Sequence, residues 1–206
     1  MLITKIEQQK KDASRYSIFL DHKFSFGLSG VDVLYFKLKE DEVLDKEKYE
    51  YILEHVVYEE AKRKAFNYVS AGYKTEKEVR DKLLIREYSE EIIDKVIDVL
   101  KQYNYVDDRV YAKKFIEYRT KTKKQGLFKI KHDLIIKGIS EEIINEFFDD
   151  FKNDSGETIV SLIEKKAKGL KNLEYKEKQR IIGFLMRRGF SCEEINEGFK
   201  IYFESE

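Results

Sequence analysis

Apolar and polar residues largely alternate over the first 28 residues of the chain. The alternation covers residues 16–20 and 23–26, with Asp21-His22 between them. A period of two predicts a β-hairpin, and residues 2–9 predict a strand that precedes it. An isolated hairpin is marginally stable in water. We therefore expect this region to pack on the segments that follow.

From Ser29 onward the period becomes that of amphipathic helices. Ser29 precedes a short apolar stretch, and Asp45 precedes a longer one. Serine and aspartate side chains accept hydrogen bonds from the first backbone N–H groups of a helix. Each of these two residues is therefore expected to begin a helix. The chain contains no proline, which favours long helical segments.

The remainder of the chain matches itself at an offset of 51 residues, as in Leu83, Leu134 and Leu185. The same offset aligns four further sets: Arg86, Lys137 and Arg188; Tyr88, Ile139 and Phe190; Ser89, Ser140 and Ser191; Ile93, Ile144 and Ile195. Self-similarity at a fixed period is typical of tandem structural repeats. The sequence therefore predicts a mainly α fold, in which three tandem three-helix repeats form an elongated or curved array behind a small N-terminal β-hairpin region.

The ends of the helices follow the same repeat. Gly138 and Gly189 fit the left-handed position after a second helix, where the first repeat has Glu87 instead. Thr75 with Glu78, and Ser191 with Glu194, have the spacing of a capping box. We place the domain boundaries as follows: 1–55 for the hairpin and a helical extension, 56–106 for the first repeat, 107–154 for the second and 155–206 for the third.

The composition of the chain excludes several classes of protein but does not indicate a function. The 40 basic and 40 acidic side chains cancel, so charge has to be interpreted locally. There is no long apolar run and no secretory signal pattern, which predicts a cytoplasmic protein without a membrane partner. The single cysteine, Cys192, can form no internal disulfide. We expect this thiol to be partly buried and inert.

Two motifs could indicate an enzyme. Tyr105-Val106-Asp107-Asp108 is similar to the paired aspartates of reverse transcriptases, but here the aspartates open an amphipathic helix, so a helix-capping role is favoured. Neither the three histidines nor the ten glycines form a metal-binding, catalytic or phosphate-binding pattern. We expect no enzymatic activity, no cofactor and no metal.

Local charge gives the candidate binding residues. Between residues 109 and 131 every charged residue is basic except Glu117. Aromatic residues lie between these basic residues. A second, more dilute cluster contains Lys165, Lys166, Lys168, Lys171, Lys176, Lys178, Arg180, Arg187 and Arg188. A basic field of this kind can lie along phosphates or an acidic protein surface. The candidate partner-binding or DNA-binding residues are Lys113, Lys114, Arg119, Lys121, Lys123, Lys124, Lys129, Lys131, Arg187 and Arg188. The alternative is that these lysines form a solvated helix face and the aromatics form the core.

The second repeat resembles the middle repeat of the RecX family. The resemblance rests on Tyr105, Asp107, Asp108, Tyr111, Ala112, Phe115, Ile116, Arg119, Gly126, Ile130, Leu134, Lys137, Gly138 and Ile139. The opening residues 3–7 and 19–21 are similar to the N-terminal extension of some members. The first repeat departs from the family at Tyr73-Lys74-Thr75, where a basic pair and a serine are expected.

This resemblance implies a regulator that binds the RecA recombinase and its filament on single-stranded DNA. It implies inhibition of filament growth, of recombinase activity and of coprotease activity, and thereby modulation of DNA repair. In that picture Tyr105, Tyr111, Phe115, Leu134 and Ile139 belong to the repeat core. We expect a monomer that spans adjacent RecA protomers. The alternative is a general nucleic-acid-binding helical repeat protein that acts without a recombinase.

Overall fold

A computed structural model describes residues 1–10, 12–151, 155–168, 170 and 172–204 of the chain, except for the side chains of residues 149 and 150. Lys171 of the second basic cluster lies outside the described residues. The chain divides into two compact units, Met1–Asp107 and Asp108–Glu206. Each unit is described by itself.

The first unit begins with an antiparallel sheet of three strands in the order β1-β2-β3. Its strands are β1 (Ile3–Gln8), β2 (Arg15–Leu20) and β3 (Lys23–Ser29). Asp21 and His22 join β2 to β3, and both have positive φ angles, 48° and 65°. Turns of this geometry match the twist of the flanking strands. The predicted hairpin and the strand before it are thus confirmed.

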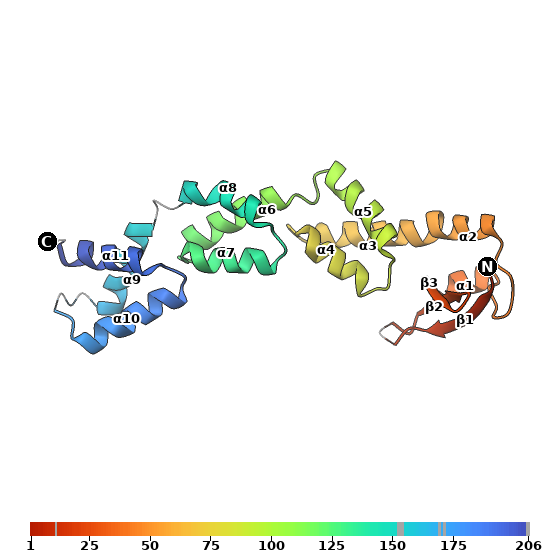
Figure 1. Cartoon of the computed structure of the whole chain (residues 1–206), viewed down its shortest axis with the longest axis horizontal. Helices are drawn as coiled ribbons and strands as arrows, with labels where there is room; N and C mark the ends of the chain where they lie inside the picture. Colours follow the sequence, from red (N-terminus) through yellow and green to blue (C-terminus); the bar gives the residue numbers. More distant parts are fainter. Residues whose placement is uncertain (11, 152–154, 169, 171, 205–206) are drawn as a thin grey trace. The chain divides into compact units, whose positions relative to one another are not determined.

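Helices fill the rest of the first unit (Figure 1). They are α1 (Gly30–Tyr35), α2 (Lys46–Ile52), the π-helical turn η1 (Leu53–Val57), α3 (Tyr58–Val69), α4 (Glu76–Leu84) and α5 (Glu90–Gln102). Ser29 accepts a hydrogen bond from the backbone N of Asp32 at 3.1 Å, and Asp45 accepts one from Lys48 N at 2.8 Å. Both predicted helix starts are confirmed.

The second unit is entirely helical over its described residues. Its helices are α6 (Asp108–Glu117), the π-helical turn η2 (Tyr118–Thr122), α7 (Leu127–Ile136), α8 (Glu141–Phe151), α9 (Ser155–Ala167), α10 (Tyr175–Arg187) and α11 (Cys192–Glu204). One apolar cluster lies within α6–α8 and another within α9–α11. Each repeat of this unit therefore has its own core.

The three-helix repeat predicted from the 51-residue offset is confirmed. Leu83, Leu134 and Leu185 are all fully buried. The position that follows the second helix is left-handed in each repeat, with φ of 61° at Glu87, 86° at Gly138 and 92° at Gly189. Residues related by the 51-residue offset therefore share backbone conformation as well as burial. Glu87 adopts a positive φ angle, which favours glycine.

Both predicted capping boxes are present. Thr75 accepts a hydrogen bond from Glu78 N at 3.1 Å while the Glu78 carboxylate accepts one from Thr75 N at 3.0 Å. Ser191 and Glu194 form the same pair of bonds, at 3.0 and 2.7 Å. The third helix of the last repeat therefore begins where the sequence predicts.

Two expectations about burial are wrong. The family resemblance places Tyr105 in the repeat core, yet its side chain is 50% exposed, and its ring meets that of Phe66 edge to face with centroids 5.1 Å apart. The thiol of Cys192, expected to be partly buried, is exposed. Cys192 is the first residue of α11, and its side chain does not face the core of the repeat.

The sheet packs on the first repeat through a shared core and a polar contact. Ile18, Phe26 and Leu28 of the sheet belong to the same buried cluster as Ile93 and Leu100 of α5. The predicted packing of the hairpin region on the helices is therefore confirmed.

Arg15 lies at the centre of the polar contact and is only 3% exposed. Its guanidinium pairs with the Glu60 carboxylate of α3, donates to the carbonyl of Gly27 at 3.2 Å and lies 5.3 Å from the ring of Tyr88. Burial opposes its charge, but the hydrogen bond to Glu60 and the negative groups nearby outweigh this and raise the Arg15 pKa.

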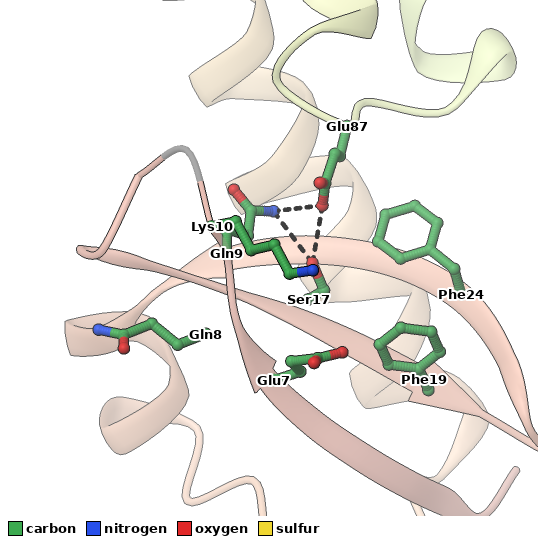
Figure 2. A pocket seen from close by; sticks show the side chains of 8 residues that line it. All are labelled: Glu7, Gln8, Gln9, Lys10, Ser17, Phe19, Phe24 and Glu87. Carbon is green, nitrogen blue, oxygen red and sulfur yellow. Dashed lines mark hydrogen bonds between the residues drawn. The ribbon is translucent and has the colours of Figure 1, made fainter.

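The turn that carries Glu87 also contacts the sheet. Figure 2 shows the Glu87 carboxylate directed at β2 and the end of β1, where it accepts hydrogen bonds from Ser17 Oγ at 2.7 Å and Gln9 Nε2 at 2.8 Å. The rings of Phe19 and Phe24 line the same hollow. Glu87, the residue that departs from glycine in the repeat, therefore holds the sheet to the first repeat.

Candidate partner-binding surface at the joint of the second and third repeats

Within the second unit, the start of α7 contacts the turn that follows α10. The backbone N–H of Gly126 donates to the carbonyl of Arg188 at 2.9 Å, and that of Phe128 donates to the carbonyl of Gly189 at 3.2 Å. A Cβ at position 126 would lie 2.2 Å from the Gly189 oxygen, so no larger residue fits there. We call this contact between residues 123–128 and 188–190 the joint.

Arg188 fastens the joint with its side chain. Its Nη1 donates to the carbonyls of Lys123 at 2.7 Å and Lys124 at 3.0 Å, which follow the π-helical turn η2. The ammonium of Lys124 in turn donates to Ser161 Oγ of α9 at 3.0 Å. Cationic donors satisfy carbonyls that a helix end leaves without partners.

The repeats fit closely at the joint. The space left between Thr120, Phe151 and Phe190 is only about 20 Å³. That volume holds at most one water molecule. At this point the contact leaves little room for water, and the hydrogen bonds of the joint hold the second and third repeats together.

Some of the candidate cations are engaged inside the second unit. Arg119 donates to Gln125 Oε1 at 3.1 Å, lies 3.8 Å from the Asp133 carboxylate and covers the ring of Phe115 at 4.7 Å. Lys131 pairs with Glu141 at 2.7 Å. Together with Arg188 and Lys124, these side chains stabilise the fold.

Four of the candidate cations differ, because they are exposed and form no ion pair among the described residues. They are Lys113, Lys121, Lys123 and Lys129. The ammonium of Lys123 lies 5.5 Å from the ring of Tyr118. Lys114 is also exposed and has partners of its own within the structure. Arg187, the remaining candidate, is exposed at the end of α10.

Exposed aromatic rings accompany these cations. Phe128, at the start of α7, is 67% exposed, and Tyr118, at the start of η2, is 49% exposed. We call the set Tyr118, Lys121, Lys123, Phe128 and Lys129 the joint surface. Cations between exposed aromatic rings suit a partner that carries negative charge and flat apolar groups.

The sequence does not predict the joint itself, although it does indicate where each of the two glycines lies within its own repeat. Gly189 is predicted as a helix end, and Gly126 lies at the start of the second helix, where the first repeat has Thr75. Their direct contact joins segments more than 60 residues apart. No local pattern specifies such a contact.

The aspartate pair lies as the sequence predicts, since α6 begins at Asp108. In the part of the chain that the structure describes, no three His, Cys, Asp or Glu side chains are grouped as metal ligands would be. No helix among the described residues is both long and apolar enough to span a membrane.

A sheet followed by three three-helix repeats defines a helical-repeat protein. The chain belongs to the RecX family of regulatory proteins. The family models match in order: the RecX N-terminal domain over residues 1–45, the first three-helix domain over 61–100, the second over 107–146 and the third over 154–197.

Curated relatives and solved structures agree with this assignment. The regulatory protein RecX of Clostridium acetobutylicum is 36% identical over 207 residues, covering 98% of this chain and 96% of the relative. That of Clostridioides difficile is 36% identical over 191 residues, covering 92% and 90%. A crystal structure of a regulatory protein RecX matches with a TM-score of 0.66 at 26% identity, covering 97% of this chain and 98% of that chain. RecX from Lactobacillus salivarius matches with a TM-score of 0.65 at 27% identity, covering 70% and 96%.

Proposed function

We propose that this protein is a cytoplasmic, monomeric regulator that binds the RecA recombinase filament on single-stranded DNA and inhibits filament growth. Inhibition of recombinase and coprotease activity would follow from that binding. Membership of a family of regulatory proteins supports a regulatory role. The observation that carries the binding proposal is the joint surface, which contains three exposed lysines that form no ion pair with any described residue, and two exposed aromatic rings close to them in the chain.

The joint gives this surface the rigidity that binding requires. The backbone carbonyl of Lys123 itself accepts a hydrogen bond from Arg188, and Lys129 adjoins Gly189 in the third repeat. Because these lysines stand on segments already fixed by backbone hydrogen bonds, less conformational entropy is lost when a partner binds. Lysines without acidic partners also keep their full charge available for phosphates or acidic side chains.

The experiment is a titration of this protein into RecA-catalysed ATP hydrolysis on single-stranded DNA. The wild-type chain is expected to inhibit at amounts well below those needed to coat the DNA, because a block on filament growth acts at few positions. Lys121→Glu/Lys123→Glu/Lys129→Glu is expected to raise the inhibitory concentration by more than about tenfold, since three favourable contacts become repulsive.

The matched control reverses three exposed cations of the first unit that form no ion pair among the described residues, namely Lys23, Lys37 and Arg63. Their replacement by glutamate changes the net charge equally and should leave inhibition nearly unchanged. Equal loss in both triple variants would assign the effect to net charge and remove the joint surface from the proposal. Unchanged inhibition by the joint variant would do the same.

The second candidate function is direct binding of nucleic acid without a recombinase. Phe128 favours it, because a ring that is two-thirds exposed beside Lys129 can stack on an unpaired base. It predicts tight binding to free single-stranded DNA that weakens steeply with salt. Inhibition of RecA only at concentrations that saturate the DNA would favour this candidate over the regulator.

A further inference from the structure

A hollow of about 440 Å³ opens in the third repeat between α9 and α10. Its apolar lining includes Leu173, Ile181 and Phe184. Its charged lining includes Lys166 and Lys168 near the end of α9, and Arg180 and Arg187 along α10. The volume falls in the range of small-molecule sites, which run from roughly 300 to 1,000 Å³.

The charge of this hollow is unbalanced. Among the described residues that line it, four are cations and one is an acid, Glu177. The Glu177 carboxylate accepts a hydrogen bond from the backbone N of Glu174 at 3.3 Å in a capping box. Lys166, Lys168, Arg180 and Arg187 are exposed and form no ion pair with any described residue. Like charges gathered around one hollow repel one another unless an anion is bound.

The cations are arranged around an apolar floor rather than spread over a flat face. The ammonium of Lys166 lies 4.6 Å from the centroid of the Phe184 ring, which Arg188 also approaches at 5.0 Å. Cation–π contact holds the Lys166 head at this position. Leu170, which also lines the hollow, is held to α11, since the Tyr202 hydroxyl donates to the Leu170 carbonyl at 3.0 Å.

We propose that this hollow binds a nucleoside phosphate, with the apolar floor against the nucleoside and the cationic rim on the phosphates. A simple anion would use the rim and leave the floor empty, and an apolar ligand would leave the cations without partners. The nucleoside phosphate comes either as a free nucleotide or as one unit of a single strand. This inference does not rest on the recombinase, because the site lies on α9 and α10 and its test contains no RecA.

The test measures binding to the full chain by isothermal titration calorimetry. The probes are deoxythymidine triphosphate and a short single-stranded oligothymidylate, with inorganic triphosphate and an oligoglutamate peptide for comparison. A nucleotide probe is expected to bind saturably and at least about tenfold more tightly than inorganic triphosphate, because only the nucleotide covers the apolar floor. Saturable binding of both nucleotide probes would identify the site as one for free nucleotide as well as strand, and binding of the oligonucleotide alone would identify a strand site.

Arg180→Glu is expected to weaken nucleotide binding by roughly tenfold or more, since an attractive phosphate contact becomes repulsive. Arg180 is exposed and forms no hydrogen bond or ion pair with any described residue, so folding should not change; circular dichroism checks this. Lys165→Glu is the matched control, because Lys165 lies on α9 beside Lys166 and outside the hollow. It should change binding by less than about twofold.

Four results would overturn the proposal. They are the absence of saturable binding by either nucleotide probe, equal weakening by Lys165→Glu and Arg180→Glu, inorganic triphosphate binding as tightly as the nucleotide, and oligoglutamate binding with the same response to the variants. Absence of saturable binding would exclude a site, and equal weakening by the two variants would indicate a diffuse positive potential. Equally tight binding of inorganic triphosphate would indicate an anion site that does not use the apolar floor. Binding of oligoglutamate would indicate an acidic protein partner. The RecA assay of the joint surface is unaffected by each of them.

Discussion

At the scale of single residues, the joint depends on Gly126, which has no Cβ atom. Gly126→Ala would place a Cβ 2.2 Å from the Gly189 oxygen and 2.5 Å from the Phe190 nitrogen, both of which are backbone atoms. The joint must open to admit it, so we expect a loss of roughly 1–3 kcal/mol in the free energy of unfolding of the second unit. Urea denaturation followed by circular dichroism measures this loss.

Gly156→Ala is the control for that substitution. Gly156 lies in the first turn of α9, and no atom of the described residues stands within 4 Å of a Cβ added there. Alanine is expected to leave stability unchanged or to raise it by up to about 1 kcal/mol. If Gly126→Ala proved as mild as Gly156→Ala, the close backbone approach at the joint would be wrong.

Tyr88 makes the stability of the first unit depend on alkaline pH. Burial raises its pKa from 10.0 to about 12, with the nearby Arg15 opposing and Glu60 adding to the rise. Below pH 10 the tyrosine is protonated in both states, and its contribution is complete. Between pH 10 and 12 only the unfolded chain loses the proton, so stability falls as the pH rises.

Tyr88→Phe should remove this component of the pH dependence. Unfolding free energies at pH 9 and pH 11.5 are expected to differ by roughly 2 kcal/mol more for the wild-type chain than for the variant. Lysines and the other tyrosines titrate in both proteins, so only the difference reports on Tyr88. Parallel pH profiles for the two chains would contradict the burial of this hydroxyl.

At the scale of helices and turns, local chemistry explains what the sequence could predict. Ser29, Asp45 and the Thr75–Glu78 pair act within three residues of themselves, so their caps follow from the chain alone. Arg188 acts on carbonyls 64 and 65 residues away. An arginine side chain suits either a binding site or a structural role, and the sequence alone does not distinguish the two. The contacts of Arg188 in the folded chain do.

The neighbouring arginines Arg187 and Arg188 offer a matched pair that separates these roles. Arg188→Ala removes the donors to Lys123 and Lys124 and should cost roughly 1–3 kcal/mol of unfolding free energy. Hydrogen exchange of residues 119–128 should rise at the same time. Arg187→Ala removes an exposed cation and should stay within about 0.5 kcal/mol of wild type. Equal stability of the two variants would refute the structural role of Arg188.

At the scale of the whole molecule, the cores decide which parts can fold alone. One cluster unites the sheet with the first repeat, whereas the clusters of α6–α8 and α9–α11 lie wholly within the second unit. Removal of residues 1–29 would expose apolar residues of the shared cluster to water, first those of α2 and η1, on which β3 packs. We expect the shortened chain to lose the cooperative folding of its first unit and to keep that of the second.

Hydrogen exchange read by mass spectrometry tests this expectation in one sample. Amides of α3 and α5 should lose protection, while those of α7 and α9 should keep it, relative to the intact chain. Undiminished protection in α3 and α5 would mean that the first repeat folds without the sheet. The repeat offset predicted these helices, but it could not show that the first repeat shares its core with the sheet. Hydrophobic periodicity identifies strands and helices but does not specify which elements pack together.

The turn after the second helix of a repeat has one further consequence. In the third repeat this turn contacts the repeat before it, and in the first repeat the equivalent turn at Glu87 contacts the sheet instead. In the first repeat, the sheet therefore takes up the hydrogen-bonding groups of the turn that, in the third repeat, holds the neighbouring repeat. The Glu87 carboxylate is thus already committed within its own chain and is not available to a partner.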